Sequence, residues 1–194
     1  AKLLAEAGWE QTRDGLRNAK GEKLSIEFLL FEVNFERIIA PFIKNLKLIG
    51  VDATMRRVDP AQYQRRLKDF DFDITTQRYS LRLTPGIELK NFWGTEAAAM
   101  SGSYNLAGIA DPVLDALLDS VISATSREEL VAATRAADRV LRAGHYWIPQ
   151  WYKGAHSIAF WDKFGWPEVK PKYARGALET WWFDGEKAKA AGRR

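Results

Sequence analysis

Carboxylate side chains close together in residues 69–73 are the part of the sequence best suited to acid–base chemistry. Asp71 and Asp73 are two residues apart, so on a strand both would lie on the same face. Two such carboxylates could serve glycoside hydrolysis, in which one acid protonates the leaving group and the other assists the attack. The same pattern is typical of the solvated side of a strand where it begins. We adopt this second interpretation, in which Asp71 and Asp73 flank Phe72 on the solvated side of the strand.

The residues needed for other familiar chemistries are missing or wrongly spaced. The sequence has no cysteine, which excludes disulfides, thiol nucleophiles and cysteine metal sites. His145 and His156 have no histidine partner at metal-ligand spacing. Neither a G-x-S-x-G elbow nor a nucleotide-binding glycine fingerprint occurs. We therefore predict no catalytic residue, no metal ion and no cofactor.

Two arginines and a tyrosine stand where a predicted strand gives way to a loop. In residues 76–86, Arg78, Tyr79 and Arg82 precede a proline–glycine turn. Loops next to rigid strands often carry function, and an arginine can bind a carboxylate or phosphate through two parallel hydrogen bonds. The alternative is a solvated loop whose arginines bind no ligand, or pair with acids outside this chain.

The composition limits the classes of partner. The chain has 194 residues, of which 46% are hydrophobic and 28% are charged, so it can bury one sizeable core or two small ones. The net charge of +4 is small and lies partly in the final EKAKAAGRR, so charge favours no partner. Six of the eight tryptophans follow residue 146 without a dense lattice of lysine and arginine. We therefore expect packing or pocket walls rather than nucleic-acid binding.

The elements that position the basic stretch follow an α/β pattern. The expected strands cover three ranges: residues 23–31, 51–58 and 70–77. Apolar residues at helical spacing predict a helix over residues 35–49 with Asn34 as its N-cap, and this crossover favours a parallel pair of strands. A second helix should begin after Asp59 and end near Lys68.

The second half is predicted to be mainly helical. Asp111 and Ser126 cap two helices, and the short turn between them predicts an antiparallel pair. A short helix or turn over residues 87–93 and a loop over residues 94–110 precede this pair. The strands expected after it cover three ranges, followed by a frayed tail: residues 146–152, 156–161 and 177–183.

The order of these segments resembles family 5 of the extracellular solute-binding proteins, the oligopeptide, dipeptide and nickel-type receptors that feed ABC importers. Five pieces carry the resemblance: AKLLAEAGW, LIGVDATMRRVDPAQYQRRL, DFDI, SYNLAGIADPVLDALLD and REELVAATRAADRVLRAGHYWIPQWY. The ending, IAFWDKFGWPEVKPKY followed by ETWWFD, resembles the subgroup of long peptide receptors that includes microcin C-type binding proteins.

The resemblance implies a fold and a division of the chain. We expect an α/β, periplasmic-binding-protein type II-like lobe with a mixed sheet flanked by helices. Members of the family are much longer than this chain, so the resemblance implies an incomplete, C-terminal part of a two-lobed receptor. Residues 1–145 would belong to the second ligand-binding lobe, and residues 146–194 would cross back toward the missing first lobe.

The resemblance also gives the basic stretch a place in a ligand site. In peptide receptors of this family, the strand leads to an aromatic residue and then to an aspartate that pairs with the α-amino group of the peptide. Tyr79 matches the aromatic residue, and the aspartate position falls on or beside Arg82. No acid occurs between Asp73 and Glu88. An arginine cannot pair with an ammonium, so we expect Arg82, Tyr79 and Arg78 to form a ligand-facing rim that binds a carboxylate or phosphate.

Three further residues are candidates for ligand contact. In the family, the segment that matches residues 101–108 borders the cleft, where Tyr104 and Asn105 could offer hydrogen bonds. The alternative for Asn105 is that it only stabilises the turn. Trp151 flanks the predicted crossover and could stack on a ligand, whereas core packing is expected for Trp147.

The function implied by the resemblance is solute capture without chemistry. The intact receptor would bind an oligopeptide or related solute and deliver it to an ABC permease, in the periplasm or on the outer face of a membrane. A sugar- or opine-type solute is the alternative within the family, and a carbohydrate-active enzyme using Asp71 and Asp73 is the alternative outside it. Without the opposite lobe, the chain should expose apolar surface and self-associate.

Overall fold

The computed structural model describes most of the chain, namely residues 1–155, 157–172 and 179–192. It divides into two compact units. The first, the strand unit, comprises Ala1–Tyr79 and Thr95–Gly108, and the second, the helical unit, comprises Ser80–Gly94 and Ile109–Arg194. The chain therefore passes three times from one unit to the other, and each unit has its own hydrophobic core.

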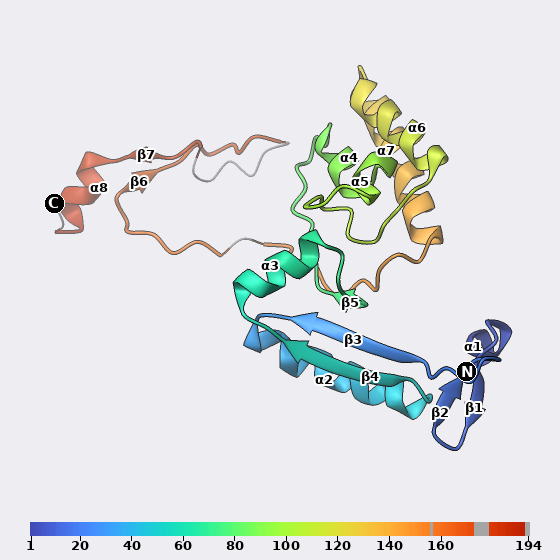
Figure 1. Ribbon diagram of the computed structural model, residues 1–194. Coiled ribbons are helices and arrows are strands. Elements are labelled where there is room, and N and C mark those ends of the chain that lie inside the picture. The colour runs from blue at the N-terminus through green and yellow to red at the C-terminus, as the bar shows by residue number, and fades with distance from the viewer. Residues whose placement is uncertain (156, 173–178, 193–194) are drawn as a thin grey trace. The chain divides into compact units, whose positions relative to one another are not determined.

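A parallel three-stranded sheet forms the centre of the strand unit (Figure 1). Its strands, in the order β4, β3 and β5, are Asp52–Arg57, Ser25–Leu30 and Ile74–Thr75. Helix α2 (Val33–Leu48) connects β3 to β4, and helix α3 (Pro60–Lys68) lies between β4 and β5 in the chain. The predicted α/β class and the parallel pair are confirmed, with Phe28 of β3 opposite Met55 of β4.

The remaining elements of the strand unit lie outside this sheet. They are α1 (Lys2–Glu6), the antiparallel pair β1 (Glu10–Thr12) and β2 (Gly15–Arg17), and α5 (Thr95–Ala98). The short helix α5 lies within residues 94–110, where only a loop was predicted.

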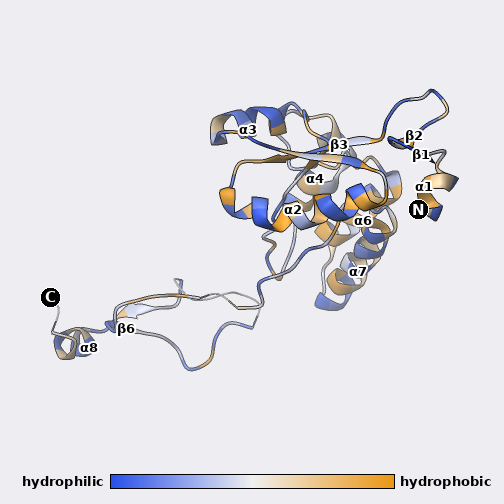
Figure 2. Cartoon of the chain, turned by 90° about the horizontal axis from the view of Figure 1, so that it is seen from below, coloured by the Kyte–Doolittle hydropathy of each residue, from blue (hydrophilic) through white to orange (hydrophobic). Residues whose placement is uncertain are grey.

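The central strand β3 presents different side chains to helices α2 and α3. Successive side chains of a strand point to opposite faces. Phe28 and Leu30 are buried in a core with Ile39 of α2. Glu27, which alternates to the opposite face of the strand, binds Arg66 of α3. Figure 2 shows hydrophobic and hydrophilic residues alternating along α2, as expected for a helix with one buried face.

Two long helices form the centre of the helical unit. Helices α6 (Pro112–Ser123) and α7 (Arg127–Ala143) are joined by a short turn and pack against each other, which confirms the predicted pair. The short helix α4 (Glu88–Trp93) packs against α6, in the place where a short helix or turn was predicted. The buried core of this unit consists of Leu89, Ile109, Leu114, Leu118, Val121, Leu130, Ala137 and Leu141.

The last part of the helical unit is rich in aromatic contacts. Strands β6 (Phe164–Gly165) and β7 (Trp182–Phe183) form an antiparallel pair, and α8 (Gly185–Ala190) follows. The ammonium group of Lys187 in α8 lies 4.5 Å from the ring centre of Trp166. It also donates a hydrogen bond of 3.0 Å to the carbonyl of Phe164, which ties α8 to β6.

Three predicted helix caps are confirmed. The carboxylate of Asp59 accepts hydrogen bonds from the backbone amides of Ala61 and Gln62, each at 2.9 Å. The side chains of Asp111 and Ser126 cap α6 and α7 in the same way. These polar side chains satisfy amides that have no partner inside the helix.

Two predicted boundaries are wrong. The N-cap of α2 is Glu32, whose side chain makes no capping hydrogen bond, and Asn34 lies inside the first turn. The third strand has two residues instead of covering residues 70–77. A carboxylate oxygen of Asp73 accepts the backbone N–H of Glu27 at 2.8 Å, so a side chain takes the place that a strand carbonyl would occupy.

Of the three strands predicted for the C-terminal part, the one over residues 177–183 is confirmed in its last two residues, which form β7, and the other two are wrong. The described residues of 146–161 contain no strand. Pro149 lacks the N–H that a ladder needs, and the aromatic rings pack on one another instead, with the centres of Phe160 and Trp181 4.8 Å apart. The expected frayed tail includes α8, because Asp184 caps this helix with its carboxylate. His156 lies outside the described residues.

The stability of α7 should depend on pH through Glu129. Hydrogen bonds from the backbone and side chain of Thr125 lower the pKa of Glu129. A carboxylate whose pKa is lowered in the folded state stabilises that state above its unfolded pKa and loses this effect as the pH falls. Glu129→Ala should therefore reduce the free energy of unfolding at pH 7, and the difference from wild type should shrink below about pH 4.

Urea unfolding followed by circular dichroism at several pH values would measure this difference. Glu128→Ala is the matched control, since Glu128 is the exposed neighbouring acid in the same first turn. Equal pH dependence for the two variants would contradict the assignment to Glu129.

One polar side chain is fully enclosed, and its loss should destabilise the fold. Asn105 is 0% exposed, whereas its neighbour Tyr104 is 52% exposed. Removing a buried hydrogen-bonding group leaves its partners unsatisfied, at a cost of about 1–3 kcal/mol. Asn105→Ala should lower the free energy of unfolding by about this amount, and Tyr104→Ala should change it much less. Denaturant unfolding of both variants would show whether Asn105 stabilises the turn.

Candidate functional site

Two predicted site residues of the strand unit, Arg78 and Tyr79, lie just beyond the carboxyl end of the parallel sheet. Glu32 follows shortly after the end of β3, and Arg78 and Tyr79 follow the end of β5. In open α/β sheets, ligands bind in the crevice outside the carboxyl ends of the strands. This edge is therefore the place in the strand unit where a ligand is most expected.

Arg78 is held by two neighbours and remains largely exposed. Its guanidinium lies 3.4 Å from a carboxylate oxygen of Glu32 and 5.6 Å from the ring centre of Phe35. The Arg78 side chain is 78% exposed, so the ion pair contributes little to stability. The ion pair places a carboxylate and a guanidinium side by side at the sheet edge. The acid-free stretch around Arg78 thus receives a carboxylate from Glu32, which lies between β3 and α2.

Glu32 was missed by the sequence analysis. It stands 46 positions before Arg78, and no local motif marks it. The signal that could have identified it is topological, because β3 and β5 are parallel neighbours and their carboxyl ends lie side by side. A residue just after one strand should therefore meet a residue just after the other.

The support beneath this edge comes from α3 and β3. The hydroxyl groups of Tyr63 and Thr75 are 2.7 Å apart, and the hydroxyl of Thr75 donates to the carbonyl of Leu29 at 3.2 Å. The ring of Phe31 packs on that of Tyr63 with their centres 4.6 Å apart. These contacts fix the end of the short strand β5, from which the segment carrying Arg78 continues.

The two acids considered for catalysis are engaged in structural contacts. A carboxylate oxygen of Asp71 lies 2.8 Å from Nε of Arg66, and Asp73 accepts the backbone N–H of Glu27. Desolvation lowers the pKa of Arg66, but the hydrogen bonds and charges of Asp71 and Glu27 raise it above its ordinary value. Both acids thus hold α3 and β5 against β3, and the geometry gives no support to a carboxylate pair facing a substrate.

Arg82 lies in a loop of the helical unit that is fixed on both sides. Leu81 packs against the core of that unit. Nη1 of Arg127, at the start of α7, donates to the carbonyl of Leu83 at 2.8 Å and approaches Oγ1 of Thr84 at 3.4 Å. Arg82 itself is exposed, and within the described ranges its guanidinium takes part in no hydrogen bond, ion pair or ring contact.

The remaining candidates differ in exposure. Asn105 is buried in the strand unit, and its backbone N–H binds the hydroxyl of Ser103 at 3.3 Å. That hydroxyl donates to the carbonyl of Ala97 at 2.6 Å, so the turn is internally bonded and the burial of Asn105 favours its stabilising role. Tyr104 and Trp151 are exposed, by 52% and 63%.

The predicted site residues are divided between the two units. Arg78, Tyr79, Tyr104 and Asn105 belong to the strand unit, and Arg82 and Trp151 belong to the helical unit. The expected core role of Trp147 is confirmed, since it packs against the core of the helical unit and stacks on Trp93 with ring centres 6.2 Å apart.

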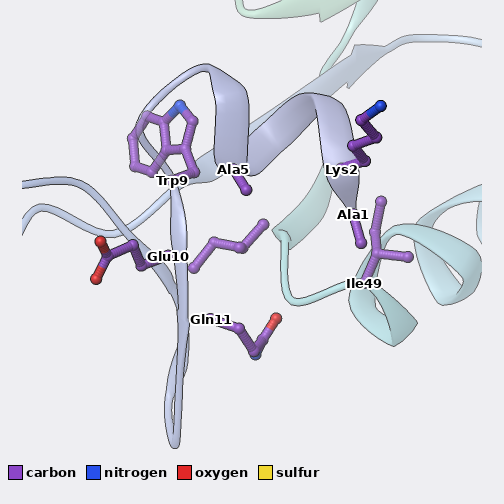
Figure 3. A pocket seen from close by; sticks show the side chains of 8 residues that line it. Ala1, Lys2, Ala5, Trp9, Glu10, Gln11 and Ile49 are labelled. Carbon is purple, nitrogen blue, oxygen red and sulfur yellow. The ribbon is translucent and has the colours of Figure 1, made fainter.

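Two surface hollows lie away from these residues. One, of about 440 Å³, is bordered by α1, β1 and the end of α2. Figure 3 shows Trp9, Gln11 and Ile49 around it, with the charged end of Glu10 turned outward. The other, of about 390 Å³, runs along α7 beside Arg127. None of the six predicted site residues lines either hollow.

The described part of the chain offers neither a metal cluster nor a membrane-spanning helix. It contains no group of three or more histidine, aspartate or glutamate side chains placed to hold a metal ion. None of its helices combines the length and the apolar character needed to cross a lipid bilayer.

Comparison with known proteins gives relatives along almost the whole chain. A probable peptide-binding protein, YejA of Agrobacterium fabrum, is 47% identical over 182 residues, which is 93% of this chain and 30% of the relative. A peptidoglycan-binding protein, YepA of the same organism, is 37% identical over 179 residues, or 92% of this chain and 29% of the relative. The chain thus spans about 30% of the length of these curated relatives. No protein-family model matches the sequence.

A solved structure supports the same relationship at the level of the fold. The oligopeptide-binding protein AppA from Bacillus subtilis, in complex with a nonapeptide, matches 94% of this chain and 36% of its own length, with a TM-score of 0.67 and 18% identity. The expected mixed α/β lobe is confirmed by this match. The chain is therefore similar in sequence to part of a probable peptide-binding protein, and in fold to part of periplasmic oligopeptide-binding proteins.

Proposed function

We propose that this chain is part of a periplasmic receptor that captures an oligopeptide or a related solute and delivers it to an ABC permease. The observation that carries the proposal is the 47% identity to a probable peptide-binding protein over 93% of the chain. The fold match to an oligopeptide-binding protein supports it. Such a receptor binds and releases its solute, and no catalytic step is required of any residue.

The subgroup of long peptide receptors that includes microcin C-type binding proteins is the finer proposal. It rests on the relationship to YejA-type proteins at 47% and 35% identity and on the C-terminal motifs of this sequence. A ligand that combines sugar and peptide is the second candidate. The relationship to a peptidoglycan-binding protein, at 37% identity, favours it over an opine.

The division of the chain at residues 145 and 146 belongs to the same proposal. Residues 1–145 would form part of one ligand-binding lobe, and residues 146–194 would pack on a part of the receptor outside this chain. Exposed aromatic side chains in residues 151–183 support this, because packing on the rest of the receptor would cover them. They are Trp151, Tyr152, Phe160, Trp161, Trp166, Trp182 and Phe183.

The ligand-contacting residues proposed for this receptor are Arg82, Arg78 and Tyr79, together with Tyr104 and Trp151. Arg82 is the strongest of them, because an exposed guanidinium without a partner in the described chain can bind a carboxylate or phosphate at no cost in existing contacts. Arg78 would contribute as a pair with Glu32. The carboxylate of Glu32 could bind a cationic group of the solute, and the guanidinium of Arg78 could bind an anionic one.

Replacing Arg82 should weaken solute binding. The complete receptor would be purified under native conditions, and the solute that it carries would be identified by mass spectrometry. Arg82→Ala should then reduce affinity for that solute by about tenfold or more, because hydrogen bonds to charged groups are worth about 1.5–3 kcal/mol. Arg139→Ala is the control, an exposed arginine on α7 of the same unit. Unchanged affinity in Arg82→Ala would remove Arg82 from the site.

The isolated 194-residue chain should self-associate. The exposed aromatic side chains of residues 151–183 would be covered in the proposed receptor, and in the isolated chain they favour contact with a second copy. Light scattering coupled to size-exclusion chromatography should give a mass that rises with protein concentration. A strictly monomeric chain at high concentration would count against the proposed packing surface.

A further inference from the structure

We propose that Arg127 is a positioning residue that holds residues 80–86, here called the Arg82 loop, so that Arg82 presents its guanidinium to a carboxylate or phosphate of the solute. The inference rests on the proposed function, because it assumes that Arg82 contacts a solute. Arg127 belongs to helix α7, and no sequence motif associates this residue with ligand binding.

The Arg82 loop depends on contacts from outside itself. It contains no helix or strand, so its backbone conformation is not fixed by a hydrogen-bonded ladder. Arg127 supplies such a contact by donating from Nη1 to the carbonyl of Leu83 at 2.8 Å, with Oγ1 of Thr84 at 3.4 Å. A hydrogen bond from a charged donor is stronger than one between neutral groups.

The helix that carries Arg127 is a firm base for this contact. Arg127 is the first residue of α7, which has 17 residues. The side chain of Ser126 binds the amide of Glu129, and the carboxylate of Glu129 binds the amide and hydroxyl of Thr125. The first turn is therefore bonded on both sides of Arg127, and Leu130 anchors it in the buried core.

A second anchor acts on the other side of Arg82. Leu81 packs against the core of the helical unit, whereas Arg82 is exposed and has no partner within the described ranges. With Leu81 held inward and Leu83 held by its carbonyl, the chain directs Arg82 outward. Fixing a loop in its binding conformation reduces the entropy lost when a ligand binds.

The charges around the Arg82 loop favour an anionic group on the solute. The groups of the Arg82 loop that bind Arg127 are a carbonyl and a hydroxyl. Both are neutral, so these contacts do not neutralise the positive charge of Arg127. No acidic residue occurs in the sequence between Asp73 and Glu88. Arg82 thus stands in a stretch without a carboxylate of its own, where a carboxylate or phosphate is favoured and an ammonium is disfavoured.

A double-mutant cycle in the complete receptor tests the inference. The probes are tetra-alanine and its C-terminal amide, which differ by one carboxylate. Arg82→Ala should weaken binding of the free acid by about tenfold and leave the amide unchanged. Arg127→Ala should weaken binding of the free acid by threefold or more. This second effect should disappear in the Arg82→Ala background, because Arg127 acts through Arg82. Arg127→Lys, which keeps one donor, should restore part of the affinity.

Hydrogen–deuterium exchange gives a readout that does not need a ligand. The amides of the Arg82 loop should exchange faster in Arg127→Ala than in wild type, with no change in the control Arg139→Ala. If Arg127→Ala bound the free acid with wild-type affinity and showed wild-type exchange, the inference would be overturned. Additive effects of the two substitutions in the cycle would also overturn it. Either result would leave the proposed function intact. An Arg82→Ala variant that still prefers the free acid would instead remove Arg82 from the proposed site. A receptor that binds neither probe would contradict the proposed peptide function.

Discussion

The burial of strand β3 is the constraint on which the rest of the strand unit depends. Phe28, Leu29 and Leu30 are at most 2% exposed, and β3 is the only strand of its sheet that pairs with two others in the described chain. Burying three large apolar side chains contributes roughly 1.5–3 kcal/mol each. This fixes the register of β4 and β5 and therefore the place where each strand ends. The position of Arg78 next to Glu32 follows from that register.

Much of this framework could be predicted because the signals are local. The strand–helix–strand order follows from the spacing of apolar residues, and the caps at Asp59, Asp111 and Ser126 follow from side chains that bond amides two or three positions away. Where the sequence misled, a contact from a distant segment decided the structure. The carboxylate of Asp73 bonds to Glu27, which lies 46 positions earlier, and β5 becomes short. No periodicity within residues 70–77 contains that information.

The candidate site shows the same division between local and distant information. Arg78, Tyr79 and Arg82 could be identified by residue type and by their position after a strand. Their neighbours could not, because Glu32 reaches Arg78 through strand pairing and Arg127 reaches Leu83 through the packing of α7. These neighbours change the chemistry of the site. Arg78 becomes half of an ion pair, whereas Arg82 retains an exposed guanidinium on an anchored backbone.

The two edges of the sheet are chemically unlike, and this has a consequence for aggregation. The edge strand β4 ends in two exposed arginines, Arg56 and Arg57, whose side chains pair with Glu27 and Glu36. Charged side chains on an edge strand discourage another strand from pairing there. At the opposite edge, β5 is only two residues long and offers little backbone to a second sheet. The sheet is therefore a poor template for cross-β growth, and we expect the proposed self-association to use side-chain surfaces, so that dilution and mild detergent should reverse it.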